Sequence, residues 1–179
     1  QADVQYLTND RLFLESDGSD IRAKGIPKLP RINPGTVLNN KRLSSLLSDE
    51  RKTELAKLSN KELWDLEEKY DVYPEQMYGP DKIVNEASFK ALLILNWQRD
   101  IDTPCSIEQV DIRQRKDLLK AVMKSPGPFY QYADGSFYSD ETKLDGQPYL
   151  ALLNDVMIYE ASGKVDFDYA ADYCLEHIL

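Results

Sequence analysis

Short apolar runs separated by turn-forming residues dominate the start of the chain. Residues 4–8 and 12–15 have the composition of strands, and a turn is predicted at 17–20, where the sequence reads Asp-Gly-Ser-Asp. A further strand is predicted over 21–26, so these segments favour a β-hairpin. The loop at 27–35 contains three prolines. We expect neither helix nor central strand there, because proline fixes φ and lacks an N–H donor.

Helical spacing of apolar positions follows this loop. Residues 37–47 and 49–58 predict two helices, and Ser59 with Glu62 forms a capping box that predicts a third helix reaching about Tyr70. The expected core residues are Leu38, Leu43, Leu46 and Leu47 of the first helix and Leu63, Trp64 and Leu66 of the third. The stretch 72–81 contains two prolines and a glycine and is expected to be irregular.

Strand and helix patterns succeed one another irregularly in the second half of the chain. The predicted elements are, in order, a strand at 89–97, a helix at 114–124, a hairpin joining 129–132 to 136–138, an element at 149–154 that fits helix or strand, a strand at 156–161 and a helix at 168–178. The last helix is expected to bury Tyr169, Ala170, Tyr173, Cys174 and Ile178. The mixture predicts an α/β or α+β fold class without strict β–α–β alternation.

Composition narrows the function classes. The chain has 179 residues, of which 42% are hydrophobic and 30% charged, as expected for one soluble domain spanning 1–179. The longest apolar run, Ala91–Leu95, is too short to span a membrane. The net charge of −9 disfavours nucleic acid as the main partner. The chain begins with Gln1 rather than Met, which indicates a processed product or the C-terminal part of a larger protein.

The cysteine and histidine residues argue against thiol-redox motifs, His-based catalysis and His-rich zinc sites. Cys105 and Cys174 are far apart and form no C-x-x-C motif, which predicts reduced thiols and a cytoplasmic location. The single histidine, His177, lies near the end of the chain and leaves little room for His-based catalysis or a His-rich zinc site. A basic face on the helix predicted at 114–124 is interpreted as its solvated side; its members are Arg113, Arg115, Lys116, Lys120 and Lys124. The aromatic residues of the hairpin are interpreted as cross-strand pairs rather than a base-stacking platform.

Two short segments carry the candidate chemistry. The first apolar run ends at Asn9 and Asp10, and in P-loop phosphotransferases a strand ends on the aspartate that holds Mg²⁺. Lys28 and Arg31 lie between prolines, so they are cations on a stiff segment that could face phosphate. The alternative interpretation is a turn-capping aspartate and a solvated loop. No G-x-x-x-x-G-K-[ST] sequence is present, so the phosphate loop of such an enzyme is missing from this chain.

Five segments together resemble one known family. They read LTNDRLFLE at 7–15, GIPKLPRINPGTVL at 25–38, LWDLEEKYDVY at 63–73, MKSPGPFY at 123–130 and VDFDYA at 165–170. In this order they resemble the bacterial HPr kinase-related proteins of the kinase B branch. The resemblance implies a P-loop-kinase-like mixed sheet flanked by helices, with this chain corresponding to the part that follows the phosphate loop.

The resemblance also implies an activity. The intact protein is expected to bind ATP and Mg²⁺ and to move the γ-phosphate to a serine hydroxyl of a small protein. HPr kinases carry two acidic residues where this chain has Asn9 and Asp10, so Asp10 takes the catalytic and metal role, while Asn9 cannot act as a base. Asn9, Lys28 and Arg31 are then the cofactor-binding residues. The glycine-rich signature of true HPr kinases is absent, so neither phosphorylase activity nor HPr as the substrate is implied, and a homo-oligomer is left open.

The sequence therefore supports two hypotheses. The first is a serine kinase part that is inactive by itself and depends on an upstream phosphate loop. The second is a non-catalytic interaction module built on a degenerate kinase scaffold, with Asn9 marking lost chemistry.

Overall fold

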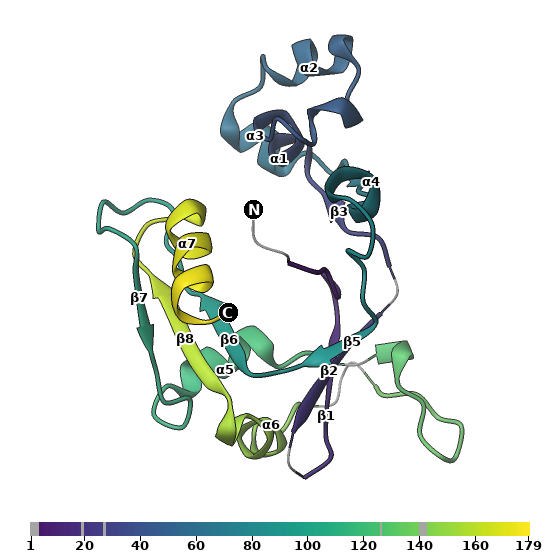
Figure 1. Ribbon diagram of the computed structural model, residues 1–179, viewed down its shortest axis with the longest axis vertical. Coiled ribbons are helices and arrows are strands. Elements are labelled where there is room, and N and C mark those ends of the chain that lie inside the picture. Colours follow the sequence, from purple (N-terminus) through teal and green to yellow (C-terminus); the bar gives the residue numbers. More distant parts are fainter. Residues whose placement is uncertain (1–3, 19, 27, 126, 140–142) are drawn as a thin grey trace. The chain divides into compact units, whose positions relative to one another are not determined.

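A computed structural model describes residues 4–18, 20–26, 28–125, 127–139 and 143–179, in which small sheets and short helices are mixed (Figure 1). The fold class is therefore mixed α/β, compatible with α+β. The chain divides into two compact units. Unit 1 comprises Gln1–Glu15 and Arg22–Ala87, and unit 2 comprises Ser16–Ile21 and Ser88–Leu179.

The predicted N-terminal hairpin is confirmed. Strands β1 (Leu12–Ser16) and β2 (Ile21–Gly25) lie side by side, and β5 (Glu86–Ser88) extends the sheet in the order β1-β2-β5. In the turn, the backbone N–H of Asp17 donates to the carbonyl of Asp20 at 3.2 Å. Ser19, part of the predicted turn, lies outside the described residues. The strand predicted at 4–8 is reduced to a single parallel bridge, which pairs Tyr6 with Ile83.

Unit 1 also contains a helical part with its own core. Its elements are β3 (Arg31–Ile32), α1 (Pro34–Asn39), η1 (Ser44–Leu46), α2 (Asp49–Leu55), α3 (Asn60–Asp65), β4 (Tyr70–Asp71) and α4 (Pro74–Tyr78). β3 and β4 form a two-stranded antiparallel sheet. The core of this part consists of Val37, Leu43, Leu47, Leu55, Leu63 and Val72.

Several boundaries in unit 1 differ from the prediction. The segment 37–47 is not one helix: α1 begins earlier, at Pro34, because proline suits the first helical turn, and it ends at Asn39. Asn40 is extended and its side chain accepts from the N–H of Arg42, so a local bond replaces the helical one. The loop predicted at 27–35 contains strand β3, while Pro27 of that loop lies outside the described residues.

The capping box at the start of α3 is confirmed. The Ser59 hydroxyl accepts from the N–H of Glu62, and the Glu62 carboxylate accepts from the N–H of Ser59 at 2.8 Å. The helix ends at Asp65 rather than near Tyr70, because Tyr70 pairs with Ile32 in the small sheet. Trp64 was expected in the core, yet it is 58% exposed, since a short amphipathic helix buries only the stripe that contains Leu63. Helix α4 was not predicted.

Unit 2 is built on a three-stranded sheet in the order β6-β8-β7. β6 (Ala91–Leu95) and β8 (Met157–Ser162) are parallel, and β7 (Ser106–Gln109) runs antiparallel to β8. Two of these strands were predicted and β7 was not. β6 is not buried on both faces throughout, because Leu95 is 52% exposed.

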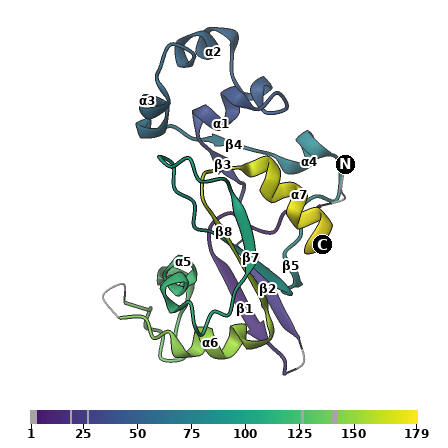
Figure 2. The ribbon, with the colours of Figure 1, turned by 90° about the vertical axis from the view of Figure 1, so that its left-hand side faces the viewer.

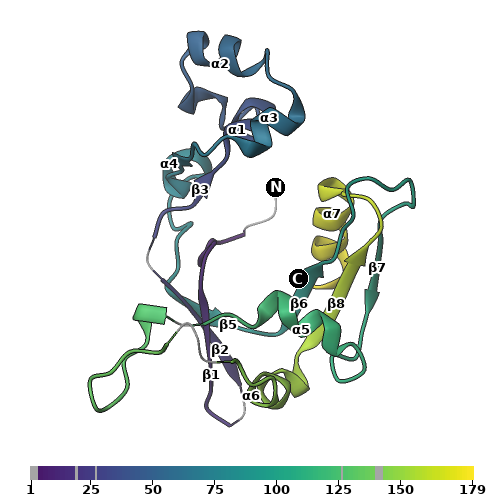
Figure 3. The same cartoon turned by 180° about the vertical axis from the view of Figure 1, so that it is seen from behind.

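Helices cover both faces of this sheet. The final helix α7 (Phe167–His177) was predicted, and its Ala170 packs with Tyr159 and Ala161 on one face. Figure 2 shows α5 (Leu119–Val122) on the opposite side of the sheet from α7. In Figure 3, which is the view from behind, the side that carries α5 faces the reader. The remaining helical turns are η2 (Lys116–Leu118), η3 (Gly127–Phe129), α6 (Gln147–Leu152) and η4 (Leu153–Asp155).

Two details of unit 2 correct the sequence interpretation. The helix predicted at 114–124 is a 3₁₀ turn followed by one α-helical turn, and Pro126, expected to end it, lies outside the described residues. Tyr169, expected to be buried in α7, is exposed. The hairpin interpretation is confirmed: Gln131 bridges Phe137, and the Tyr132 ring stacks on Tyr138 across the turn with centroids 6.1 Å apart.

Candidate functional site

Asp10 and Lys28 come together in unit 1, although 18 positions separate them in sequence. The Lys28 Nζ lies 3.6 Å from the Asp10 Oδ2. The two side chains are 29% (Asp10) and 49% (Lys28) exposed, so both charged ends remain accessible to a ligand in solution. An acidic and a basic group at this separation could face the same metal-bound phosphate.

Tyr6 connects the segments that carry this pair. Its backbone N–H donates to the carbonyl of Lys82 at 2.7 Å, and its carbonyl accepts from the N–H of Val84 at 3.0 Å. The Tyr6 hydroxyl lies 3.1 Å from the Asn9 Oδ1 and 3.4 Å from the carbonyl oxygen of Lys28. Burial is the main reason that the pKa of Tyr6 lies above 10.0; a hydrogen bond with the Asn9 backbone lowers it, and the Asp10 charge raises it. The hydroxyl therefore keeps its proton at neutral pH.

A glycine permits the close approach of the two segments. A Cβ on Gly25 would lie 2.5 Å from the carbonyl oxygen of Leu7 and 3.0 Å from the Cβ of Thr8. Three residues after Gly25 comes Lys28, and two residues after Thr8 comes Asp10. The Thr8 hydroxyl accepts from the N–H of Asp10 at 3.3 Å, which forms the turn that presents the carboxylate.

Arg31, the other expected phosphate ligand, has a different partner. It stands on β3 directly opposite Asp71 of β4, and its Nε lies 3.5 Å from the Asp71 Oδ1. The structure therefore pairs Lys28 with Asp10 and pairs Arg31 with a strand neighbour.

The donor set fits a magnesium ion of the kind bound with a nucleotide. Among the described residues, no three His, Cys, Asp or Glu side chains converge as they would in an all-protein metal site. Mg²⁺ commonly takes one or two carboxylates and completes its shell with water and phosphate oxygens. Asp10 supplies one such carboxylate, while the Asn9 Oδ1 accepts from the Tyr6 hydroxyl. Asp10 is the residue that would hold the ion.

A second polar centre, in unit 2, was not predicted. The carboxylate of Glu160 on β8 is only 10% exposed and accepts two hydrogen bonds from Arg115 and one from the Asn96 Nδ2 at 2.7 Å. Arg115 also pairs with Asp117. The interpretation of Arg115 as part of a solvated basic face is therefore wrong. The signal in the sequence is a single carboxylate inside the otherwise apolar stretch 156–161, which predicts a buried and paired charge.

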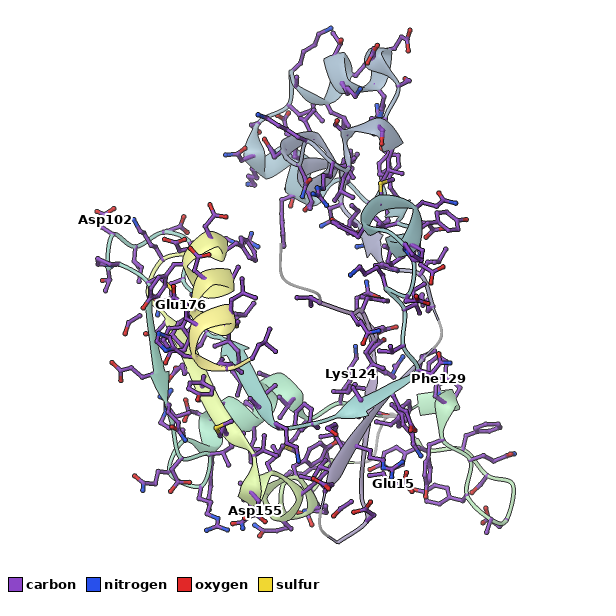
Figure 4. All side chains as sticks on the ribbon, in the orientation of Figure 1. Glu15, Asp102, Lys124, Phe129, Asp155 and Glu176 are labelled. Atoms are coloured by element: carbon purple, nitrogen blue, oxygen red, sulfur yellow. The ribbon has the colours of Figure 1, made fainter. Side chains whose placement is uncertain are left out.

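A shallow cavity of about 500 Å³ is also present in unit 2. Its apolar floor consists of Ile112, Leu153, Val156 and Ile158, and its polar rim includes Gln109, Asp111, Arg113 and Asn154. The Asp111 carboxylate already accepts from the N–H of Arg113 and from the Gln114 side chain. Asp155, the residue after Asn154, is labelled in Figure 4. The Asp111 carboxylate of the rim is thus already hydrogen-bonded within the protein.

The helices in the described ranges are too short or too polar for any of them to cross a lipid bilayer. No protein-family model matches the sequence, and neither the curated proteins nor the solved structures give a significant match.

Proposed function

We propose that the chain is the C-terminal part of an HPr kinase-like, ATP-dependent phosphotransferase with a P-loop-kinase-like fold. The intact enzyme would move the γ-phosphate of ATP to a serine hydroxyl of a small protein. The observation that carries the proposal is the 3.6 Å separation between the Asp10 carboxylate and the Lys28 ammonium, on two segments far apart in sequence.

Each residue has a distinct task in this proposal. Asp10 offers a hard oxygen ligand to Mg²⁺, which when bound neutralises phosphate charge. Lys28 offers a point charge to a phosphate oxygen on the same side. Arg31 is paired with Asp71 rather than with Asp10, so Lys28 is the principal cation. Positioning and charge neutralisation supply most of the catalysis of phosphoryl transfer, and little covalent chemistry is asked of the protein.

The proposal is tested in a protein that includes the sequence upstream of Gln1. We expect Asp10→Asn to abolish Mg²⁺-dependent phosphate transfer and Lys28→Gln to lower it about tenfold or more. Asp65→Asn, at the end of α3, is the matched control and should leave the rate unchanged. Transfer by Asp10→Asn at the rate of the unchanged protein would contradict the proposal. The 179-residue chain alone is expected to hydrolyse no ATP.

A non-catalytic interaction module is the second candidate. Its support is Asn9 in place of a second carboxylate, together with the exposed aromatic residues Phe129, Tyr130, Tyr132 and Phe137. Phe129 is labelled in Figure 4. The sequence upstream of Gln1 separates the two candidates: a G-x-x-x-x-G-K-[ST] motif within about 30 residues favours the kinase, given the length of a β–α unit.

A further inference from the structure

We infer that Tyr6 is a positioning residue whose hydroxyl sets the spacing between Asp10 and Lys28. This inference rests on the proposed function, because it assigns Tyr6 a role in the same site. Tyr6 does not touch the metal or the phosphate; it acts through the two segments that do.

The first step is the weakness of the charged pair itself. Asp10 and Lys28 are separated by 3.6 Å, and both side chains are partly open to solvent. Exposed ion pairs contribute little to stability, because water and salt screen the attraction and two long side chains lose freedom. The attraction between the two charges is therefore too weak to fix their spacing, and another group must do so.

The second step is the anchorage of Tyr6. Its backbone is held on both sides by the segment 82–84, through bonds of 2.7 and 3.0 Å. The neighbouring Gln5 side chain donates to the carbonyl of Asp81 at 2.9 Å, which adds a third bond to the same segment. Tyr6 therefore offers its hydroxyl from a fixed position.

The third step is what the hydroxyl contacts. It reaches the side chain of Asn9, the residue before Asp10, and the backbone carbonyl of Lys28. One phenol group, whose single proton is shared between these two acceptors, therefore contacts both halves of the site.

The fourth step is the selectivity of the effect. The turn that presents Asp10 has its own bond, between the Asp10 N–H and the Thr8 hydroxyl, so it persists without Tyr6. The position of Lys28 relative to that turn depends on the shared phenol. Loss of the hydroxyl should therefore leave a metal bound at Asp10 and move Lys28 away from it.

The experiment uses the 179-residue chain, with Mn²⁺ as a paramagnetic probe for the magnesium site. In the unchanged chain, we expect Mn²⁺ to broaden the backbone amide signals of both Asp10 and Lys28. In Tyr6→Phe, the Asp10 signal should remain broadened while broadening at Lys28 falls severalfold, since the effect decreases steeply with distance. Tyr73→Phe, an exposed tyrosine of the same unit, is the matched control and should behave like the unchanged chain.

Further variants make each outcome decisive. Asn9→Ala removes the side-chain acceptor of the same hydroxyl and should reproduce the Tyr6→Phe result, so a folding defect of one variant does not decide the test. The amides of Val37 and Leu55 in the unit 1 core should not shift in either variant. Equal broadening at Asp10 and Lys28 in Tyr6→Phe and in the unchanged chain would overturn the inference. Unchanged broadening in Asp10→Asn, or none in the unchanged chain, would instead overturn the proposed function and the inference with it.

Discussion

Arg115 donates hydrogen bonds to both carboxylate oxygens of Glu160, with its Nη2 at 2.9 Å from Oε1. Asn96 donates to the same carboxylate from β6's end of the sheet. A charge on the central strand of a small sheet is costly unless it is paired, and these bonds satisfy it. They also tie the segment before η2 to β8, so the polar centre helps to hold one covering layer on the sheet.

Replacement of Glu160 by Gln should destabilise unit 2 by about 1–2 kcal/mol, because it keeps the shape and removes the charge-assisted bonds. The lower part of that range is expected, since Arg115 is 37% exposed and solvent screens part of the interaction. Urea unfolding followed by Trp97 fluorescence in a Trp64→Phe background reports on unit 2. Glu108→Gln, at the cross-strand neighbour, is the control and should change stability by less than about 0.5 kcal/mol.

The contribution of Glu160 should depend on pH. The Arg115 hydrogen bonds hold the pKa of Glu160 below its ordinary value of 4.5, so the folded carboxyl takes up a proton at lower pH than the unfolded one. The stabilisation is therefore complete above pH 4.5 and is lost as the pH falls through the folded-state value. The stability difference between the unchanged chain and Glu160→Gln should shrink as the pH is lowered below 4.5. A difference that grows in acid would contradict this account.

Gly163→Ala should destabilise unit 2 strongly. Gly163 has a φ of +84°, and a Cβ there would lie 2.2 Å from the carbonyl oxygen of Pro104. Gly135 has nearly the same φ, +85°, but the nearest atom to its Cβ would be 4.0 Å away. Gly135→Ala should therefore cost about 1 kcal/mol from backbone conformation alone, and Gly163→Ala about 2 kcal/mol more from the steric clash. If urea unfolding showed the same loss of stability for Gly163→Ala and Gly135→Ala, the steric clash would be ruled out.

Gly25→Ala should disturb the candidate site more than the unit 1 core. The added Cβ at 2.5 Å from the Leu7 carbonyl forces the segment that leads to Asp10 away from β2. We expect a loss of about 1–3 kcal/mol together with weaker Mn²⁺ broadening at Lys28. Gly35→Ala is the control within the same unit, because its Cβ would be in ordinary contact, 3.6 Å from the Leu63 Cβ. It should stabilise α1 by about 0.5–1 kcal/mol.

Ser59→Ala should destabilise the helical part of unit 1 by about 1 kcal/mol, because it leaves the N–H of Glu62 without its cap. Trp64 lies in the capped helix α3 and reports on it by fluorescence in a Trp97→Phe background. Ser45→Ala, in η1, is the comparison variant and should have a smaller effect. Identical unfolding midpoints for the two variants would show that the cap contributes nothing measurable.

Local signals predicted well the elements that local chemistry determines. The capping box of Ser59 and Glu62 satisfies backbone groups within four residues, so α3 began where the sequence indicated. Helix ends and short strands depended on distant partners instead. The third helix was predicted to reach Tyr70 but ends at Asp65, because Tyr70 pairs with Ile32 in a sheet. No local sequence pattern predicts such a pairing. β7 was missed for the same reason, since its partner in the sheet, β8, comes about fifty residues later.

The candidate site shows the same difference between what local sequence signals predict and what long-range contacts determine. Asp10 and Lys28 were chosen separately, each from its local pattern, and their contact depends on Gly25 and Tyr6, which sequence reasoning did not select. Arg31 has the same local pattern as Lys28, yet its strand register places it opposite Asp71. Charge and spacing thus identified the residue types, and long-range packing decided which of them meet.

The parallel pairing of β6 with β8 has a consequence for biosynthesis. Asn96 and Glu160 are 64 positions apart, and the strand that carries Glu160 is the middle one of its sheet. During translation, β6 and β7 have no strand to pair with until β8 has emerged from the ribosome. The helical part of unit 1 closes over much shorter loops. Translation order therefore favours assembly of the helical part of unit 1 before the sheet of unit 2, because β8 is the last of the three strands to be made.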